Sequence, residues 1–112
     1  MSGLSRKSGF NRKQFDQEIY QLIQEIPAGR VLTYGLLARL AGFPQYSRLA
    51  GQTLAHVPPA LHLPCHRVVD SQGRIAPHWP QQQALLEKEG IVFHAEGRVN
   101  LKIYLWDILR ES

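Results

Sequence analysis

Apolar side chains recur at helical spacing near the start of the chain. From Asn11 onward they fall three or four positions apart, which is typical of one face of an amphipathic helix: Phe15, Ile19, Leu22, Ile23 and Ile26. Asn11 can cap the start of this helix, and Pro27 with Gly29 ends it. We expect this helix to form part of the core.

Two shorter helices are predicted next, around a turn that contains glycine. Thr33 can cap a helix that runs through about Ala41, Gly42 suits the position after its end, and Pro44 prevents a simple continuation. A second helix is predicted from about Tyr46 to His56. This is the layout of a helix-turn-helix, whose second helix enters a DNA groove, although any helical hairpin shares the pattern.

Later segments predict little sheet. Val68 and Val69 indicate a short strand, a second β element is expected over Ile91 to Phe93, and a helical segment is expected at the C-terminal end. The predicted fold class is α/β and mainly helical, with a three-helix core. We expect residues 1–10 to be a flexible basic tail, serving solubility or weak phosphate binding, and residues 11–112 to form one domain.

The composition of the chain limits the kinds of partner and compartment that we expect. The chain has 112 residues, is 44% hydrophobic and carries a net charge of +4, which suits an anionic partner. Its single cysteine excludes an internal disulfide and fits a reducing compartment. No apolar stretch approaches the roughly 18 residues that span a bilayer, so we expect a soluble, cytoplasmic protein with no membrane partner.

The single cysteine lies in the segment Pro64-Cys65-His66-Arg67-Val68-Val69. A cysteine attacks as a thiolate, and a neighbouring imidazole is a usual acceptor for its proton. Pro64 fixes the backbone before Cys65, and the two valines anchor the segment after it. Lone cysteines are otherwise mostly inert packing residues, so this pair alone indicates a reactive thiol only weakly.

The same segment resembles the active-site signature of the O6-alkylguanine-DNA alkyltransferase family, which moves an alkyl group from guanine onto a cysteine. Segments upstream resemble the family's C-terminal DNA-binding domain in order and spacing: Ile26 to Val31, Thr33 to Ala38, Gly42 to Pro44 and Ser47 to Gly51. The likeness runs from about Phe15 to Trp106. It implies a small winged helix-turn-helix-like domain that acts on duplex DNA.

The resemblance implies a catalytic relay. Cys65 would accept the alkyl group, His66 would remove the thiol proton through a water molecule, and Glu89 would hold the histidine. Glu87, on the same helix, is a competing carboxylate for this role. Arg67 is expected to brace the strand and the loop. No metal or organic cofactor is implied.

The resemblance also implies a DNA-binding surface. The second helix would lie in the minor groove, Arg48 would fill the space left by a rotated guanine, and Tyr34 would contact the phosphate of that nucleotide. A glycine inside a helix costs about 1 kcal/mol relative to alanine, so Gly51 indicates a close approach. An ordinary core tyrosine and a solvated arginine are the alternatives. The predicted DNA-binding residues are Tyr34, Ser47, Arg48, Ala50, Gly51, Gln52 and Ser71.

The alkylated base itself would enter a pocket beside the thiol. A substituent on guanine O6 lies in the major groove near the paired base, so the base must leave the stack before a sulfur atom can approach in line. The predicted pocket residues are Tyr34, Pro64, Cys65, Val68, Arg74 and Trp79. His78 and Trp79 are expected either to form a wall of this pocket or to act as a packing lid.

Three departures from the family change the expectation. Val57 replaces a hinge asparagine, and the loop Arg74 to Pro80 is shortened and lacks a donor to O6. We also expect the protein to lack the family's second domain. Size and loop resemble the compact alkyltransferase-like proteins, which bind O6-alkylguanine without removing the alkyl group and flag it for nucleotide excision repair. Those proteins generally replace the cysteine, whereas Cys65 is present here.

We therefore predict a monomeric DNA repair protein that flips O6-alkylguanine and transfers the alkyl group once, irreversibly, to Cys65. The alternative is a sensor that does not transfer and works with nucleotide excision repair proteins. A helix-turn-helix transcription regulator would not need the thiol. A zinc site at His56, His62, Cys65 and His66 lacks a Cys-x-x-Cys pair, and adjacent residues on a strand would point apart.

Overall fold

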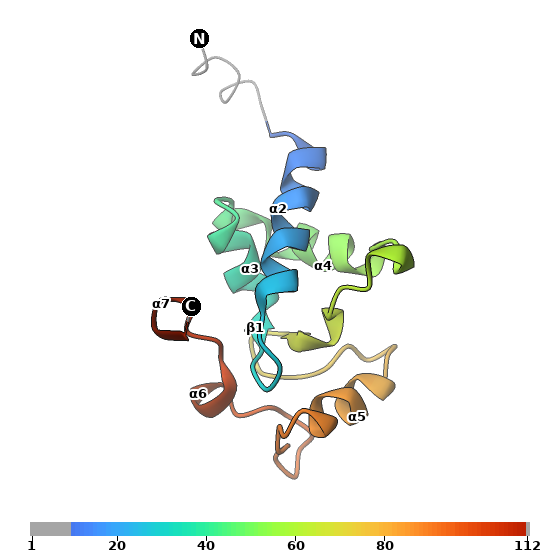
Figure 1. Ribbon diagram of the computed structural model, residues 1–112, viewed down its shortest axis with the longest axis vertical. Helices are drawn as coiled ribbons and strands as arrows, with labels where there is room; N and C mark the ends of the chain where they lie inside the picture. Colours follow the sequence, from blue (N-terminus) through green and yellow to red (C-terminus); the bar gives the residue numbers. More distant parts are fainter. Residues whose placement is uncertain (1–9, 112) are drawn as a thin grey trace.

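The computed structural model describes residues 10–111. Three helices pack together in the upper half of Figure 1: α2 (Arg12–Glu25), α3 (Tyr34–Leu40) and α4 (Ser47–Ala55). Their shared core contains Phe15, Ile19, Ile23, Leu37 and Ala50. The buried Thr53 hydroxyl of α4 donates to Asp16 of α2 at 2.8 Å. The helix-turn-helix predicted from the apolar pattern is confirmed as α3, a short 3₁₀ turn η1 (Pro44–Tyr46) and α4.

Local capping sets the boundaries of these helices. The Asn11 side chain accepts from the Gln14 amide at 3.0 Å, and the Thr33 hydroxyl accepts from the Leu36 amide at 3.2 Å. Each bond satisfies an amide that has no partner within its helix. Gly42 follows the end of α3 with a φ of +94°, the left-handed conformation that glycine adopts without strain. The predicted helix caps Asn11 and Thr33 and the predicted glycine after α3, Gly42, are therefore confirmed.

Two very short strands divide the molecule into two cores. β1 (Leu32–Thr33) pairs in parallel with β2 (Val68–Val69), with Leu32 opposite Val68. Successive side chains of a strand face opposite sides. Leu32 and Val68 accordingly pack into the helical core, whereas Val31 and Val69 pack into a second core. The β1–β2 pair therefore joins the helical core to the second core.

The second core is formed mainly by the C-terminal half of the chain, which lies in the lower part of Figure 1. It gathers Leu86 from α5 (Gln81–Lys88) with Ile91 and Val99, and α6 (Leu101–Tyr104) and α7 (Ile108–Glu111) complete the chain. The β element expected over Ile91 to Phe93 is reduced to an isolated bridge between Phe93 and Val99. The C-terminal helical segment is confirmed as two single turns.

One residue of the predicted tail belongs to the folded domain. The ring of Phe10 lies 4.6 Å from that of Tyr46 and 5.2 Å from that of Phe43, measured between centroids, and both contacts are edge-to-face. Such pairs contribute beyond their buried area. The rest of the predicted tail, residues 1–9, lies outside the described residues. Between residues 10 and 111, no helix is both long and apolar enough to cross a membrane.

A tight turn after β2 joins the segment around Gly73 to the segment around Val99. Gly73 has a φ of +81°, and its amide donates to Asp70 O at 2.9 Å to close the turn. The Val99 amide donates to Gly73 O at 2.8 Å, so backbone meets backbone here without an intervening side chain. A Cβ atom at position 73 would lie 2.3 Å from Val99 O. The turn therefore requires glycine for both its conformation and its contact.

We expect Gly73→Ala to destabilise the fold by at least about 2 kcal/mol, because strain at a left-handed residue and a backbone clash add together. Gly35→Ala is the matched control, since Gly35 lies in the first turn of α3 and a Cβ there meets no atom within 4 Å. That variant should unfold at the same urea concentration as the parent or a slightly higher one. Equal urea midpoints for the two variants would show that the Gly73 contact is not needed.

Candidate functional site

Cys65 opens a single turn of 3₁₀ helix, η3 (Cys65–Arg67), that leads directly into β2. The Cys65 amide donates to Leu63 O at 2.8 Å, and the Arg67 amide donates to Pro64 O at 3.0 Å. The expectation that Cys65 and His66 would lie on a strand is therefore wrong at these two residues. The strand begins at Val68, because the carbonyls of Leu63 and Pro64 are taken by the turn.

The carboxylate of Glu89 accepts hydrogen bonds from both His66 and Arg67 of this turn. His66 Nε2 lies 2.8 Å from Glu89 Oε2, Arg67 Nη2 lies 2.7 Å from the same oxygen, and Arg67 Nε lies 3.0 Å from Oε1. The Gly29 amide donates to Oε1 at 3.2 Å. The structure thus places Glu89, and not Glu87, against the histidine. Glu87 is exposed and pairs with Gln83.

Hydrogen bonding decides the charge of Glu89. Burial alone would raise the pKa of its carboxyl group, but bonds from Arg67, His66 and the Gly29 amide lower this pKa to about 2. Glu89 is therefore ionised near neutral pH and accepts a hydrogen bond from the N–H group at Nε2 of His66. In the neutral imidazole this leaves Nδ1 as the free acceptor of the ring.

Arg67 braces the site, as its sequence context suggested. Besides its bonds to Glu89, it donates through Nη1 to Ile26 O at the end of α2, at 2.8 Å. The side chains of Arg67 and Glu89 are only 18% and 15% exposed, so their pairing is shielded from solvent. Truncating one partner of such a pair leaves an uncompensated charge and is strongly destabilising.

A small cavity of about 70 Å³ lies beside the thiol. Its lining comes from both halves of the molecule: Tyr34, Gly51, Leu54, Ala55, Cys65, Val68, Ala76, His78, Trp79 and Gln82. Four of the six residues predicted for a base pocket line it, and His78 and Trp79 are both among its lining residues. The helix-turn-helix, the thiol turn and the 74–80 loop therefore meet at one hollow.

Two residues predicted for the pocket do not line it. Pro64 lies just before the thiol turn and fixes the backbone there. Arg74 points to solvent and pairs with Asp70 at 3.0 Å, because the turn after β2 carries both residues at its surface. Ser71, predicted for phosphate contact, lies exposed in the same turn. Pro64 and Arg74 are therefore removed from the predicted pocket, and the phosphate contact of Ser71 stays a prediction.

The thiol itself is held in its neutral form. Burial raises the pKa of Cys65, and the partly opposing effect of its own backbone amide does not reverse the shift. Burial also raises the pKa of the nearby Tyr34 hydroxyl, and Asp70 and Cys65 add to this. Among the described residues, no hydrogen bond joins Cys65 to His66. A direct Cys-His ion pair in the free protein is therefore not what this geometry provides.

The predicted DNA-binding face of α4 is corrected at one position. Ser47, Arg48 and Gln52 are exposed and Gly51 borders the cavity, but Ala50 is 0% exposed and packs in the helical core. Ala50 lies about 160° around the helix from Arg48, which follows from 100° per residue. The small side chain at position 50 packs in the helical core and is not part of the surface.

The sequence reasoning missed Gln82. Its side chain is 1% exposed, donates from Nε2 to His66 O and Val68 O, and accepts from the Ala76 amide. A signal was available, because Gln82, Leu85 and Leu86 share one face of α5 at helical spacing. A glutamine on an apolar face is a buried polar group that needs partners.

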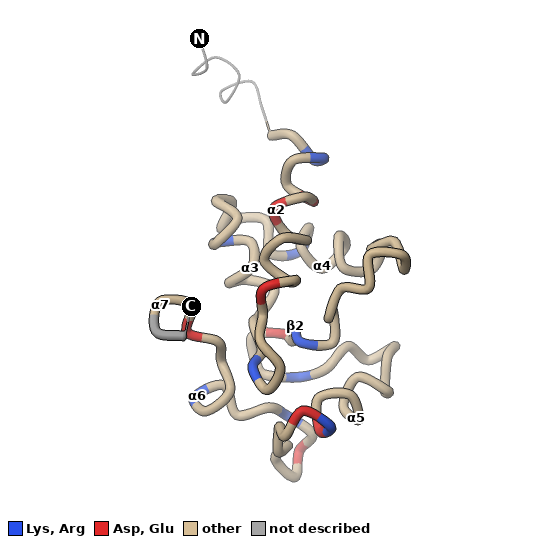
Figure 2. Tube along the Cα trace, in the orientation of Figure 1, with Lys and Arg blue, Asp and Glu red and all other residues tan. Residues whose placement is uncertain are grey.

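Charge is unevenly distributed around the site. Residues 26–69, which include α3, α4 and the thiol turn, contain no aspartate or glutamate but four arginines: Arg30, Arg39, Arg48 and Arg67. Figure 2 shows blue without red along α3 and α4, whereas red appears on α2 and at α5. Arg67 is shielded and paired with Glu89, but the exposed Arg39 and Arg48 give α3 and α4 a positive surface, which favours an anionic partner. Among the described residues, no group of three or more His, Cys, Asp or Glu could hold a metal ion.

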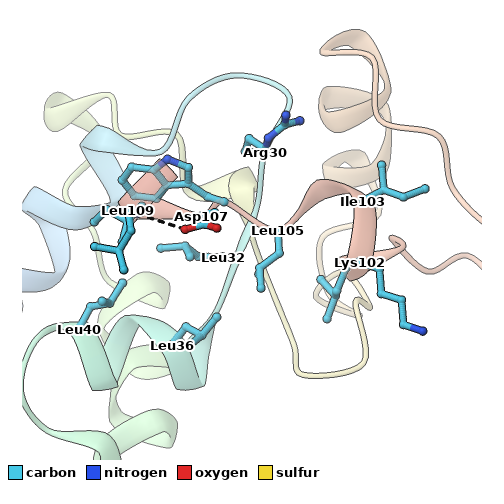
Figure 3. Close-up of a pocket in the computed structure, with 12 residues that line it drawn as sticks. Arg30, Leu32, Leu36, Leu40, Lys102, Ile103, Leu105, Asp107 and Leu109 are labelled. Carbon is cyan, nitrogen blue, oxygen red and sulfur yellow. Dashed lines mark hydrogen bonds between the residues drawn. The ribbon is translucent and has the colours of Figure 1, made fainter. Parts of the chain in front are cut away.

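A second hollow of about 800 Å³ lies between α3 and the C-terminal segment (Figure 3). Leu36 and Leu40 of α3 face Leu105 and Leu109 across it, with Arg30 nearby. None of its lining residues also lines the thiol cavity. This groove is therefore separate from the candidate site.

Residues 14–91 match the family described as 6-O-methylguanine DNA methyltransferase, DNA binding domain. The chain is 37% identical over 102 residues to alkyltransferase-like protein 1 of Schizosaccharomyces pombe, covering 83% of this chain and 94% of that protein. It is 40% identical over 97 residues to the DNA base-flipping protein of Escherichia coli, covering 83% and 74%. It is 33% identical over 78 residues to a methylated-DNA–protein-cysteine methyltransferase of Mycobacterium tuberculosis, covering 67% of this chain but only 47% of that enzyme.

A solved structure gives the same answer for the fold. The crystal structure of Schizosaccharomyces pombe Atl1 in complex with damaged DNA containing O6-carboxymethylguanine superposes with a TM-score of 0.79, at 36% identity. The superposition covers 88% of this chain and 99% of that protein. The Schizosaccharomyces pombe protein thus matches over nearly its whole length, the Escherichia coli protein over about three quarters and the methyltransferase over about half. With its DNA-binding domain matched across residues 14–91, the chain belongs to the O6-methylguanine DNA methyltransferase family.

Proposed function

We propose that this protein binds duplex DNA containing O6-alkylguanine and holds the damaged base, rotated out of the helix, in the cavity beside Cys65. The observation that carries this proposal is the composition of that cavity. Its lining combines Tyr34 and Gly51 of the helix-turn-helix with the thiol of Cys65 and the loop residue Trp79. A base that leaves a groove occupied by α4 would enter directly next to Cys65.

The chemistry of the lesion supports base rotation. A substituent on O6 weakens the pairing of guanine, so the damaged base leaves the stack at a lower cost than a normal one. Trp79 and Tyr34 offer aromatic faces to an extruded base, and stacking is worth about 1–3 kcal/mol per base. The solved relative was crystallised with DNA containing O6-carboxymethylguanine, and another relative is named a DNA base-flipping protein.

Gly51 supports a close approach of DNA to α4. A Cβ atom at this position would meet only Tyr34 Cδ1, at 4.0 Å, which is an ordinary contact. Nothing within the described protein therefore requires glycine here, yet a glycine inside a helix costs about 1 kcal/mol relative to alanine. We infer that the missing side chain makes room for the nucleic acid. Exposed Ser47, Arg48 and Gln52 flank it, and under this proposal Arg48 would enter the space that the base leaves.

Transfer of the alkyl group to Cys65 is the second candidate function, and the Cys65-His66-Glu89 arrangement favours it. In this step a bond forms between Sγ and the alkyl carbon while the bond from that carbon to guanine O6 breaks. The thiol proton passes to Nδ1 of His66 through water, and the departing guanine takes up a proton to become unmodified guanine. Glu89 would stabilise the imidazolium formed in the step.

Two features oppose fast transfer. Burial raises the pKa of the thiol, so the thiolate is scarce in the free protein. The second feature is the shortened loop Arg74 to Pro80. The residues of this loop that line the cavity are Ala76, His78 and Trp79, and none of them has a hydroxyl group that could donate to guanine O6. If transfer does not occur, the bound protein would instead act as a lesion sensor for nucleotide excision repair proteins.

Intact-mass analysis separates these two functions. After incubation with a duplex containing O6-methylguanine, transfer predicts a mass increase of one methyl group per protein, located on Cys65. Cys65→Ser should keep its preference for the lesion duplex and gain no mass. An unmodified parent protein that still prefers the lesion duplex would establish the sensor and exclude transfer. The absence of any preference for the lesion would exclude the proposed function itself.

Arg48→Ala should reduce base extrusion more than it reduces binding to the DNA backbone. Arg39→Ala is the matched control, since Arg39 is an exposed arginine on α3 and carries the same charge. Each substitution should lower the salt dependence of binding by at most about one phosphate equivalent. Only Arg48→Ala should also lower the fluorescence of 2-aminopurine placed beside the lesion, which reports unstacking. Equal fluorescence in the two variants would remove Arg48 from this role.

A further inference from the structure

Gln82 is the most deeply buried polar side chain beside the thiol turn. Both hydrogens of its amide nitrogen are used: Nε2 donates to His66 O at 3.0 Å and to Val68 O at 2.8 Å. Its amide oxygen accepts from the Ala76 amide at 2.8 Å. One side chain from α5 therefore bridges the thiol turn, the start of β2 and the 74–80 loop.

These bonds are specific to an amide of this length. A buried carbonyl or amide that loses its partner costs about 1–3 kcal/mol, so each of the three backbone groups depends on Gln82. Carbonyls at His66 and Val68 need donors, whereas the Ala76 amide needs an acceptor. A carboxylate supplies no donor and an ammonium supplies no acceptor. The neutral glutamine amide provides both at once.

The loop has few other attachments near the cavity. Within residues 75–80, the backbone bonds are those from the Trp79 amide to Ala76 O and from the Gln82 amide to Trp79 O. Among the described residues, the only side-chain bond to this loop segment is the one that the Ala76 amide donates to Gln82 Oε1. Ala76, His78 and Trp79 nevertheless form one side of the thiol cavity. The position of that side therefore depends on Gln82.

We propose that Gln82 is a positioning residue that clamps the 74–80 loop onto the thiol turn and thereby sets the width of the cavity beside Cys65. Its hold on His66 O orients the turn that carries the thiol, and its hold on Ala76 orients the loop that faces the thiol. Under the proposed function, on which this part rests, the same clamp limits the size of the O6 substituent that fits.

Gln82→Met tests the clamp, because methionine matches glutamine in length and volume but cannot bridge the three backbone groups. In the free protein, we expect the Ala76 amide to exchange its hydrogen faster while amides of α2 keep their protection. Iodoacetamide should modify Cys65 roughly threefold faster or more, because the thiol becomes more exposed. Gln83→Met is the matched control, since Gln83 is the next residue of α5 and bonds only to Glu87.

The second part of the experiment measures binding to DNA duplexes that contain guanine, O6-methylguanine or the bulkier O6-benzylguanine. Gln82→Met should lose about tenfold in its preference for O6-methylguanine over guanine, and bind the benzyl lesion relatively better. Gln82→Asn, which keeps the amide but is one methylene shorter, should behave like Gln82→Met if the span matters. This second variant keeps the proposal testable if the methionine variant does not fold.

The outcomes distinguish the clamp from the proposed function. Faster Ala76 exchange and faster Cys65 modification support the clamp even if no variant prefers damaged DNA, a result that would remove the proposed function alone. Exchange and thiol rates equal to those of the parent would overturn the clamp, whatever the DNA results. A lesion preference unchanged in both Gln82 variants would overturn its role in setting the cavity width.

Discussion

The candidate site depends on one carboxylate. Glu89 ends α5 and accepts hydrogen bonds from the turn between α2 and β1, from His66 and from Arg67. These partners lie 60, 23 and 22 positions away along the chain, so a single group joins the end of α5 to two remote segments. The bonds outweigh the cost of burial and lower the pKa of Glu89 to about 2. The site is therefore organised by a charge that is present at every physiological pH.

This carboxylate determines what the thiol turn can do. It holds the His66 ring through Nε2 and leaves Nδ1 as the acceptor, while Arg67 ties the same turn to the end of α2. The thiol is not in direct contact with that acceptor and its pKa is raised by burial. The free protein thus has a well-ordered site with a neutral cysteine. Under the proposed function, such a site would hold a damaged base whether or not it goes on to accept the alkyl group.

The sequence predicted best the features that depend on near neighbours. The caps at Asn11 and Thr33, the glycine after α3 and the bounds of α4 all follow from residues within one turn of each other. The pairing of Glu89 with His66 was implied by family resemblance and is present in the geometry. Features set by distant contacts were missed or wrong: the burial of Ala50, the packing of Phe10 and the surface pairing of Arg74. Gln82 was missed for the same reason, because its three partners come from three other segments.

The measurement that tests the central role of Glu89 most directly is the free energy of unfolding between pH 2 and pH 6, compared for the parent, Glu89→Gln and Glu87→Gln. The pKa of Glu89 is lower in the folded protein, about 2, than the value of 4.5 of a free glutamate, so its stabilising effect is complete above about pH 4.5 and is lost as the pH falls to 2. A shift of this size corresponds to at most roughly 3 kcal/mol. Glu89→Gln should lose less stability over this range than the parent, whereas Glu87→Gln should follow the parent. Parallel curves for the parent and Glu89→Gln would contradict the account.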